Sequence, residues 1–318
     1  MPNQYNQLFL DCTLRDGGFT NDFKWSDKFV NNYLHLTNKL PIEYIELGYW
    51  KQKNKSKNKF YNINEEYLIE FKKKSKKKLS VIGDFHYQEK NLSNFPKKND
   101  KILDLIRMTC RIEDLDDCID FMNDLKDYTN LKTSINFFNF SNYSSINLIK
   151  LKKKIPTIKS DYIYFADTHG SMNMLNLNDK FNKFIKFLSK SKKKIGFHFH
   201  DNIGTAMTNY NFCKTHDFNL FDITINGIGR GGGNLRTEFV MNKKDKNSIL
   251  KFISNHTKEL EINNLIYYNI TGNLGVSNIY ATYAFKIGVS FDKFFNFCKK
   301  LKGKNKDNFN IDLINKIS

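Results

Sequence analysis

The sequence IGFHFH at residues 195–200 is a short run of apolar and aromatic residues, and polar Asp201 and Asn202 follow it. Runs of this length and composition, bounded by polar residues, predict buried β-strands. Seven similar runs occur elsewhere, and the starts of all eight lie roughly 20–40 residues apart. The predicted strands cover residues 8–13, 42–47, 79–84, 101–108, 132–137, 162–166, 195–200 and 221–226.

Amphipathic segments fill the gaps between these strands, and residues 64–78, 113–128 and 178–190 show apolar residues at helical spacing. Alternating strands and helices predict repeated βα units and a parallel sheet. Eight strands with crossovers that end near Glu238 predict an α/β fold, a closed (β/α)8 TIM barrel. The alternative is an open doubly wound sheet, which would want a GxGxxG turn after its first strand, and that turn is missing.

The spacing of the elements changes after about residue 245. Residues 247–260 and 277–287 have helical patterns with no strand between them. We therefore expect two domains: a catalytic barrel at residues 1–245 and a small C-terminal helical extension at residues 246–318, which packs against the barrel or covers its mouth.

Composition excludes several classes of protein. With 318 residues, 40% hydrophobic and 15% aromatic, the chain can bury a large core and is not disordered. It has no apolar run of ~18 residues and no secretory leader pattern, so we expect a cytoplasmic protein that does not enter a membrane. Its five cysteines are scattered without a CxxC pair, which argues against a disulfide framework or a zinc knuckle.

The formal net charge of +18 comes mainly from lysine, because only five of the 51 basic residues are arginine. Lysine spread over a surface says little about function, although such a field can attract an anionic substrate. Nucleic-acid binding would usually need arginine and stacking aromatics on one face, so we do not expect a nucleic-acid partner. The same bias makes each arginine informative, since guanidinium is kept where a planar, fixed cation is needed.

Polar residues recur at the ends of the predicted strands, which is where barrel enzymes carry their active sites. His198 and His200 sit at positions i and i+2 of a strand, so their side chains share one face and can bind one metal ion. Asp16, at the end of the first strand, is the third candidate ligand; alternatively it is a turn residue before two glycines. Arg15 beside it can hold a developing oxyanion, and Glu46 can orient Arg15 as a bidentate partner or be a surface carboxylate.

A glycine-rich loop, residues 227–233, follows the last predicted strand. It can approach a ligand closely or bind an anion through its amides, although a merely flexible loop has the same composition. Asn234 at its end is either a fourth metal ligand or the N-cap of a short helix at residues 235–239.

Four motifs together resemble the HMG-CoA lyase-like family, the DRE-TIM metallolyases. They are DCTLRDGG at residues 11–18, ADTHG at 166–170, HFHDN at 198–202 and GRGGGNLRTE at 229–238. The resemblance covers residues 8 to 238, about three-quarters of the chain. The DGG after Arg15 and the GRGGGN loop are most similar to the 4-hydroxy-2-oxovalerate aldolase branch.

The resemblance implies making or breaking a carbon–carbon bond beside a metal-bound enolate. It implies that Asp16, His198 and His200 hold a divalent metal, Mn²⁺ or Mg²⁺, with Asn234 as an outer ligand. A 2-oxo acid such as pyruvate would be one substrate and an aldehyde the other. Arg15 would donate to the enolate oxygen. Glu46 would hold Arg15 in place, as its possible pairing with Arg15 already suggested.

One position departs from the family pattern. Aldolases of this branch carry a histidine base shortly after Arg-Asp-Gly, and this chain has Phe19 there. Either another group moves the proton or the chemistry differs, and the candidates for that group are His169 first, then His86 and Tyr280. The C-terminal extension also differs from the family's usual communication domain, so a dehydrogenase partner is not expected. A homodimer is expected, because barrels of this family commonly form dimers.

Three other functions fit parts of the sequence. A Claisen-type acyl-CoA lyase or synthase of the same family could use the lysine-rich residues 51–59 to meet the phosphates of a CoA ester. A catalytically silent barrel used as a binding module would explain Phe19 as the sign of a lost base. A nucleic-acid binder would show tight binding with a steep salt dependence.

Overall fold

Eight parallel strands form a closed barrel in the computed structural model, which describes residues 7–51, 58–97, 101–129, 131–263 and 265–317. Each strand pairs with the next one in the chain, and β1 closes the barrel against β8. The strands are β1 (Leu8–Asp11), β2 (Tyr44–Tyr49), β3 (Lys78–Asp84), β4 (Leu105–Cys110), β5 (Lys132–Phe137), β6 (Tyr162–Asp167), β7 (Lys194–Phe199) and β8 (Leu220–Ile223). The predicted TIM barrel is confirmed.

All eight predicted strands exist; β5 has the predicted bounds, and the other seven differ from theirs by one to four residues at one end or both. The first strand ends at Asp11, because the Asp11 carboxylate accepts a hydrogen bond from the Thr13 backbone N–H and the chain turns into the short helix α1 (Thr13–Asp16). The eighth strand ends at Ile223, since Ile225–Gly227 already forms a 3-10 turn. These two ends lead directly into polar motifs.

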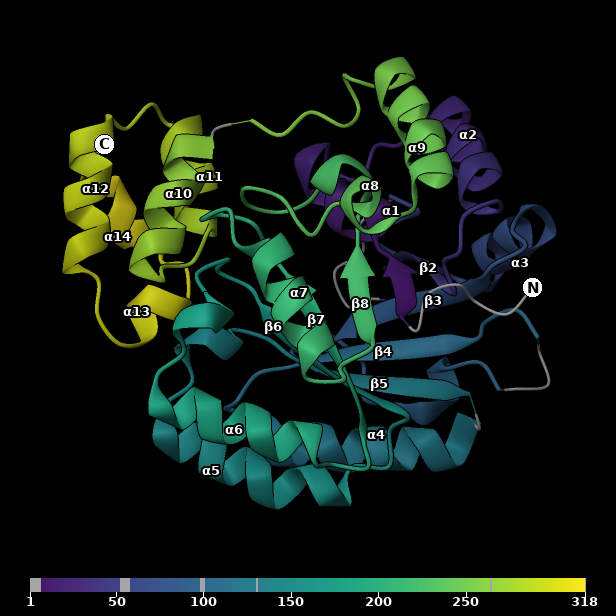
Figure 1. Cartoon of the computed structure of the whole chain (residues 1–318), viewed down its shortest axis with the longest axis horizontal. Helices are drawn as coiled ribbons and strands as arrows, with labels where there is room; N and C mark the ends of the chain where they lie inside the picture. Colours follow the sequence, from purple (N-terminus) through teal and green to yellow (C-terminus); the bar gives the residue numbers. More distant parts are fainter. Residues whose placement is uncertain (1–6, 52–57, 98–100, 130, 264, 318) are drawn as a thin grey trace.

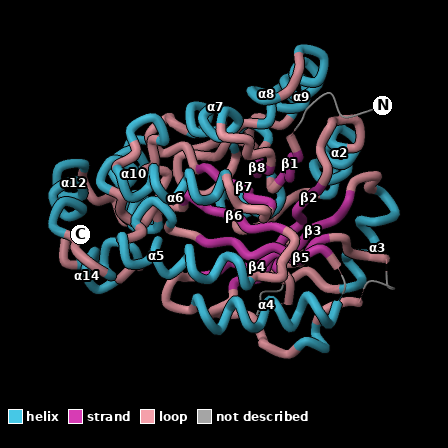
Figure 2. The backbone as a smooth tube through the Cα atoms, turned by 60° about the horizontal axis from the view of Figure 1, so that its bottom comes forward, coloured by secondary structure: helices cyan, strands magenta, loops and turns pink. Residues whose placement is uncertain are grey.

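Helices surround the strands, as Figures 1 and 2 show. Among the described residues, six of the first seven strands are followed by an α-helix, and β3 is followed by the 3-10 turn Leu92–Asn94 instead. The six helices are α2 (Asp27–Thr37), α3 (Glu65–Lys74), α4 (Leu115–Thr129), α5 (Ser145–Lys154), α6 (Asp179–Ser189) and α7 (Ala206–Thr215). Helix α2 comes after α1 and the 3-10 turn Gly17–Thr20. In α4 the apolar face predicted from the sequence is buried: Leu115, Ile119, Met122 and Leu125 are at most 2% exposed. This burial of one helix face against the outside of the strands forms the main core.

A smaller cluster fills the inside of the barrel. Tyr44 of β2 and Tyr162 of β6 come from strands that are not neighbours, yet their hydroxyl oxygens lie 3.3 Å apart. Leu10, Leu105 and Leu220 belong to the same buried cluster. The barrel is thus plugged, and a ligand can enter only at an end.

The C-terminal helices divide between two cores. After the short α8 (Thr237–Val240), α9 (Lys243–Asn255) packs on α2, where Phe252 meets Phe29 at a ring-centroid distance of 5.5 Å. The remaining helices share a core of their own that contains Tyr280 and Phe294. They are α10 (Leu265–Leu274), α11 (Ile279–Lys286), α12 (Phe291–Lys300), α13 (Lys304–Asp307) and α14 (Ile311–Asn315).

The predicted division at residues 245 and 246 stays a prediction, and this packing leads us to propose a division after α9 instead. Figure 1 shows α10 to α14 grouped at one side, beyond the ends of β6 and β7. Within the described ranges, no helix combines the length and the apolar character needed to span a membrane.

Candidate active site

A pocket of about 560 Å³ opens at the carboxyl ends of the barrel strands. Residues from the ends of β1 through β8 line it, and the C-terminal helical group adds Ser277, Asn278 and Asp307 on one side. The C-terminal extension therefore does what the sequence suggested as one option: it covers part of the barrel mouth. This pocket brings together most of the residues singled out in the sequence.

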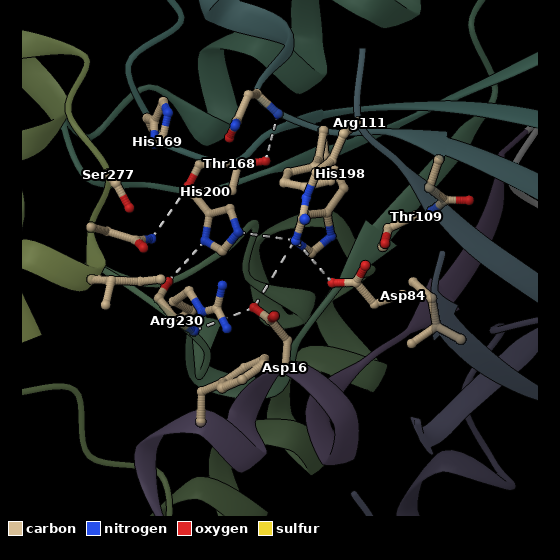
Figure 3. Close-up of a pocket in the computed structure, with 18 of the residues that line it drawn as sticks. Asp16, Asp84, Thr109, Arg111, Thr168, His169, His198, His200, Arg230 and Ser277 are labelled. Atoms are coloured by element: carbon tan, nitrogen blue, oxygen red, sulfur yellow. Dashed lines mark hydrogen bonds and ion pairs between the residues drawn. The ribbon is translucent and has the colours of Figure 1, made fainter. Parts of the chain in front are cut away.

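Asp16, His198 and His200 form a tight buried group at the base of the pocket (Figure 3). The two histidine Nε2 atoms lie 3.3 Å apart, and Asp16 Oδ2 lies 4.0 Å from His198 Nε2. All three residues are at most 5% exposed. The sequence predicted this convergence from strands that are far apart in the chain.

Hydrogen bonds fix the tautomer of both histidines. His198 Nδ1 lies 3.0 Å from Asp222 Oδ2, and His200 Nδ1 lies 2.8 Å from the carbonyl oxygen of Arg230. A carbonyl oxygen accepts but does not donate, and a carboxylate paired with an arginine does the same. Each Nδ1 therefore carries a proton, and in the neutral form of each ring the lone pair is on Nε2.

Two facing lone pairs and a carboxylate repel one another unless a cation lies between them. Burial lowers the pKa of His200 to about 3, so this imidazole is neutral near pH 7 and does not supply that positive charge. Burial raises the pKa of Asp16, but the Arg15 guanidinium and the two imidazoles outweigh it, and the net pKa lies well below its usual value. The donor set, two nitrogens and one oxygen, fits a divalent transition-type metal ion.

The spacing fits as well. Two adjacent ligands at about 2.1 Å from one ion are separated by about 3.0–3.4 Å, and the two Nε2 atoms lie within that range at 3.3 Å. A second buried group, Cys12 with His198 and Asp222, also has its ligand atoms close together. Burial raises the pKa of the Cys12 thiol well above its usual value, and Asp222 is already paired with Arg107, so this group suits a metal poorly.

Arg15 is held from two sides. Its Nε donates to Glu46 Oε1 at 2.6 Å and its Nη1 donates to Asp16 Oδ1 at 2.5 Å. Burial by itself lowers the pKa of Arg15, but the negative charges of Glu46 and Asp16 raise it by more than burial lowers it. The net pKa is well above its usual value, so the guanidinium stays charged. Glu46 is fully buried rather than at the surface, and it bridges two arginines instead of forming the bidentate pair expected from the sequence.

Arg107, on β4, is the functional candidate that the sequence analysis missed. Its guanidinium is fully buried inside the barrel, and it donates to Glu46 Oε2 at 2.9 Å and to Asp222 Oδ2 at 2.7 Å. A continuous chain of charges thus runs from Asp16 through Arg15, Glu46, Arg107 and Asp222 to His198. The rarity of arginine was the only signal in the sequence that could have found it.

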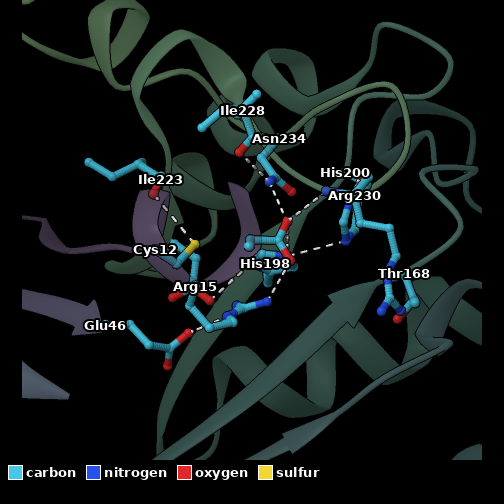
Figure 4. A network of polar contacts seen from close by, with 12 residues as sticks. Cys12, Arg15, Glu46, Thr168, His198, His200, Ile223, Ile228, Arg230 and Asn234 are labelled. Atoms are coloured by element: carbon cyan, nitrogen blue, oxygen red, sulfur yellow. Dashed lines mark hydrogen bonds and ion pairs between the residues drawn. The ribbon is translucent and has the colours of Figure 1, made fainter. Parts of the chain in front are cut away.

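Asn234 belongs to this site and does not cap a helix. Its Nδ2 donates to Asp16 Oδ2 at 2.5 Å (Figure 4). The N-cap of α8 is Arg236 instead. The Oδ1 of Asn234 is buried without a hydrogen-bond partner among the described residues, so this oxygen is available to a ligand. Gly229 permits this approach, because a Cβ at that position would clash with the Asn234 amide and with the Asp16 carboxylate.

The three candidates for the missing base lie in different places. His169 lines the pocket and is 1% exposed, with Nε2 3.4 Å from Asp307 Oδ1 of the C-terminal helical group. His86 is exposed beside Tyr87 and is not among the residues that line this pocket. Tyr280 is buried in the core of the C-terminal helices, where its hydroxyl donates to the backbone carbonyl of Asn305. It does not line the pocket either.

Comparisons with solved structures support the fold. The chain is similar to the N-terminal domain of a provisionally assigned aldolase from Bacteroides vulgatus, with a TM-score of 0.73 and 23% identity over 90% of this chain and 98% of that one. The HMG-CoA lyase of Bacillus subtilis gives a TM-score of 0.61 with 15% identity, over 84% of this chain and 99% of that one. The carboxyl transferase domain of Rhizobium etli pyruvate carboxylase gives 0.64 with 12% identity, over 93% and 56%.

Sequence comparisons identify the family. A curated relative, the (R)-citramalate synthase of Sulfolobus acidocaldarius, is 23% identical over 245 residues, which are 71% of this chain but only 45% of that protein. The chain thus spans less than half the length of this relative. The family model for HMGL-like proteins matches residues 106–266, half of the chain, from β4 into α10. The protein therefore belongs to the HMGL-like family of DRE-TIM metallolyases, enzymes that use a divalent metal.

Proposed function

We propose that the protein is a divalent-metal-dependent aldolase or lyase that acts through the enolate of a 2-oxo acid such as pyruvate, with an aldehyde as the second substrate. One observation carries this proposal: two imidazole lone pairs and a carboxylate converge at the base of a pocket, beside a charged arginine. A negative charge that develops on a substrate oxygen there would be stabilised by the metal ion on one side and by the Arg15 guanidinium on the other.

The metal ligands in this proposal are Asp16, His198 and His200, and Asn234 Oδ1 is an outer ligand. The proposed ion is Mn²⁺ or Mg²⁺. When bound, such an ion supplies Lewis-acid polarisation of the carboxylate and keto oxygens of the substrate, worth several kcal/mol of charge stabilisation. Asp222 keeps His198 in the tautomer that binds metal, and the Arg230 carbonyl does the same for His200.

Arg15 stabilises the enolate oxygen in this proposal. Its Nε and Nη1 are engaged by Glu46 and Asp16, whereas its Nη2 makes no hydrogen bond to any residue that the structure describes. That N–H group can donate to an oxyanion without breaking an existing contact. Glu46 fixes the orientation of the guanidinium plane, which a single contact to Asp16 would leave free to rotate.

His169 is the group that we propose as the base, in the place of the histidine that Phe19 replaces. The Asp307 carboxylate lies at ion-pair distance from its Nε2, so it can orient the ring and stabilise the imidazolium that forms. Asn142 Nδ2 donates to the same Asp307 oxygen at 2.5 Å and holds the carboxylate in place. The C-terminal helical group would thereby contribute to catalysis.

A synthase or lyase that uses an acyl-CoA is the alternative, and similarity to a citramalate synthase supports it. The feature invoked for CoA, the lysine-rich residues 51–59, falls for the most part on residues 52–57, which lie outside the described residues. A silent binding barrel would also have this fold, and the absence of tightly bound stoichiometric metal in purified protein would favour it.

Exchange of the pyruvate methyl protons with deuterium tests the proposal, because it reports enolate formation without knowledge of the aldehyde. Protein loaded with Mn²⁺ should exchange these protons in D₂O, followed by mass spectrometry after removal of the paramagnetic ion. EDTA should abolish the exchange. A parallel sample with acetyl-CoA and a 2-oxo acid, followed by release of free thiol, tests the alternative. Thiol release without pyruvate exchange would reject the aldolase in favour of the synthase.

A further inference from the structure

Arg230 extends from the glycine-rich loop and lies over the ring of Phe19, with its guanidinium carbon 3.8 Å from the ring centroid. Phe19 is part of an aromatic wall of the pocket. Its ring centroid is 5.1 Å from that of Phe23 and 6.1 Å from that of Tyr49, and Tyr49 in turn lies 5.2 Å from Tyr61. The residue that replaces the family's histidine therefore supports a cation.

The backbone of Arg230 is bonded directly to the candidate metal ligands. Its N–H donates to Asp16 Oδ2 at 3.3 Å, and its carbonyl oxygen accepts from His200 Nδ1 at 2.8 Å. Figure 4 shows its side chain leaving the loop next to His200. The guanidinium is therefore separated from the candidate metal ligands by the length of its own side chain. The hydrogen bonds to Asp16 and His200 hold the Arg230 backbone in place.

The charge of Arg230 has no counterion within the described part of the chain. The other two arginines that line the pocket do: Arg15 pairs with Asp16 and Glu46, and Arg111 lies 3.5 Å from Asp84. Stacking on an aromatic face holds a guanidinium in a fixed plane and leaves its N–H groups free for a ligand. A planar, oriented and unpaired guanidinium in a pocket is suited to an oxyanion.

We propose that Arg230, stacked on Phe19, determines substrate specificity by binding a terminal oxyanion, a carboxylate or a phosphate, on the end of the substrate away from the metal. The inference rests on the proposed function and adds the substrate class: the aldehyde partner, and the hydroxy-oxo acid formed from it, carries a negative group of its own. Arg111 supplies a second guanidinium to the same pocket.

Binding of matched 2-oxo acids tests this inference. 2-Oxoadipate and 2-oxohexanoate have the same chain length and differ only in a terminal carboxylate or methyl group; 2-oxoglutarate with 2-oxopentanoate and 2-oxopimelate with 2-oxoheptanoate extend the series. Their dissociation constants are measured by calorimetry on Mn²⁺-loaded protein. In at least one pair the diacid should bind about 10-fold tighter or more, as expected for a charged hydrogen bond.

Two arginine variants separate the role of Arg230 from a general charge effect. Arg230→Gln should remove the preference for the diacid, so that the diacid and the monoacid of each pair bind with similar affinity. Arg236→Gln removes the same charge outside the pocket and should keep the preference. Phe19→Leu should weaken the preference, since the stacking face is lost. Inorganic phosphate that competes with the diacid better than acetate does would identify the terminal group as a phosphate.

The outcomes distinguish this inference from the proposed function. Equal affinity within every pair, or a preference that survives in Arg230→Gln, overturns the inference and leaves the proposed function standing. If no 2-oxo acid binds but plain adipate binds in an Arg230-dependent way, the proposed function fails and the oxyanion subsite stands. If adipate fails as well, both are rejected.

Discussion

Arg107→Met tests whether the buried arginine supports both the fold and the proposed metal site. Methionine keeps much of the length and the apolar body of the side chain, and it can still pack on Tyr164, whose ring centroid lies 4.4 Å from the guanidinium carbon. It removes the charge and both hydrogen bonds, to Glu46 and to Asp222. Two buried carboxylates then lose one cation each.

The expected cost is about 3–5 kcal/mol of unfolding free energy. A hydrogen bond to a charged group is worth about 1.5–3 kcal/mol, so two give about 3–6 kcal/mol. Removing one partner of a buried ion pair costs about 3–5 kcal/mol, which agrees. In the variant Glu46 still pairs with Arg15, and Asp222 is still hydrogen-bonded to His198. The loss of stability should therefore stay below the upper end of the range of about 3–6 kcal/mol. A domain has only about 5–15 kcal/mol in total, so the variant should be folded but fragile.

Urea denaturation followed by circular dichroism measures this change, and Arg111→Met is the matched control. Arg111 lies just beyond the same strand and is partly exposed. Among the described residues its one ion pair is the 3.5 Å contact with Asp84, and its guanidinium also lies over the rings of Tyr87 and Phe138, which methionine can still contact. Its removal should therefore cost less than about 1 kcal/mol. Arg107→Met should also weaken metal binding by about 10–100-fold, because Asp222 orients His198 less well. Equal stability of the two variants would refute the claim that the buried charge chain supports the barrel.

Three further changes test single groups. His200→Ala should lower the affinity for the metal by more than the roughly 10–100-fold expected for a residue that only orients a ligand, so the variant should lose its metal on dialysis. Its circular dichroism spectrum should remain that of a folded barrel. Retained stoichiometric metal would reject the ligand set. Arg15→Lys should keep the metal but lose about 100-fold or more in turnover, because an ammonium group cannot replace the guanidinium's fixed donors, and near-normal turnover would remove Arg15 from the mechanism. Burial raises the pKa of Asp11 to about 6, partly offset by Tyr33, so Asp11 favours the fold in its protonated form; this stability is complete below pH about 4 and lost as the pH rises through about 6. The unfolding free energy of the wild type minus that of Asp11→Asn should therefore fall by up to about 3 kcal/mol between pH 4 and 7, and a pH-independent difference would show that Asp11 is not so perturbed.

The barrel could be predicted from the sequence because each strand carries its own signal. Residues 132–137 place Thr133, Ile135 and Phe137 at alternate positions and were predicted with the bounds that β5 has. Boundaries shifted where polar motifs begin, as at Asp11, because the turn there depends on a side-chain hydrogen bond and not on periodicity. Local sequence patterns determine which segments become strands. The residue at which a strand ends depends on hydrogen bonds between side chains and backbone, which form only in the folded chain.

The convergence of Asp16, His198 and His200 was predictable for the same reason, since strand ends of a barrel meet at one rim. The charge chain behind them was not. Arg107 and Asp222 are 115 residues apart in sequence, and each sits in an ordinary strand with no motif around it. Asp307 was also missed, because its contact with His169 joins the C-terminal helices to the barrel and no spacing rule links the two.

The charge balance of this chain supports the anionic 2-oxo acid that we propose as a substrate. Three carboxylates, Asp16, Glu46 and Asp222, face two guanidiniums, Arg15 and Arg107, so the buried network carries one net negative charge. A divalent cation reverses that sign and leaves one positive charge in a region of low dielectric constant, which a single carboxylate of the substrate neutralises. A monovalent cation would leave the network neutral and give the substrate carboxylate no net attraction. The network thus favours a divalent ion and a monoanionic head group together, and the free Arg230 beyond it remains available for a second anion.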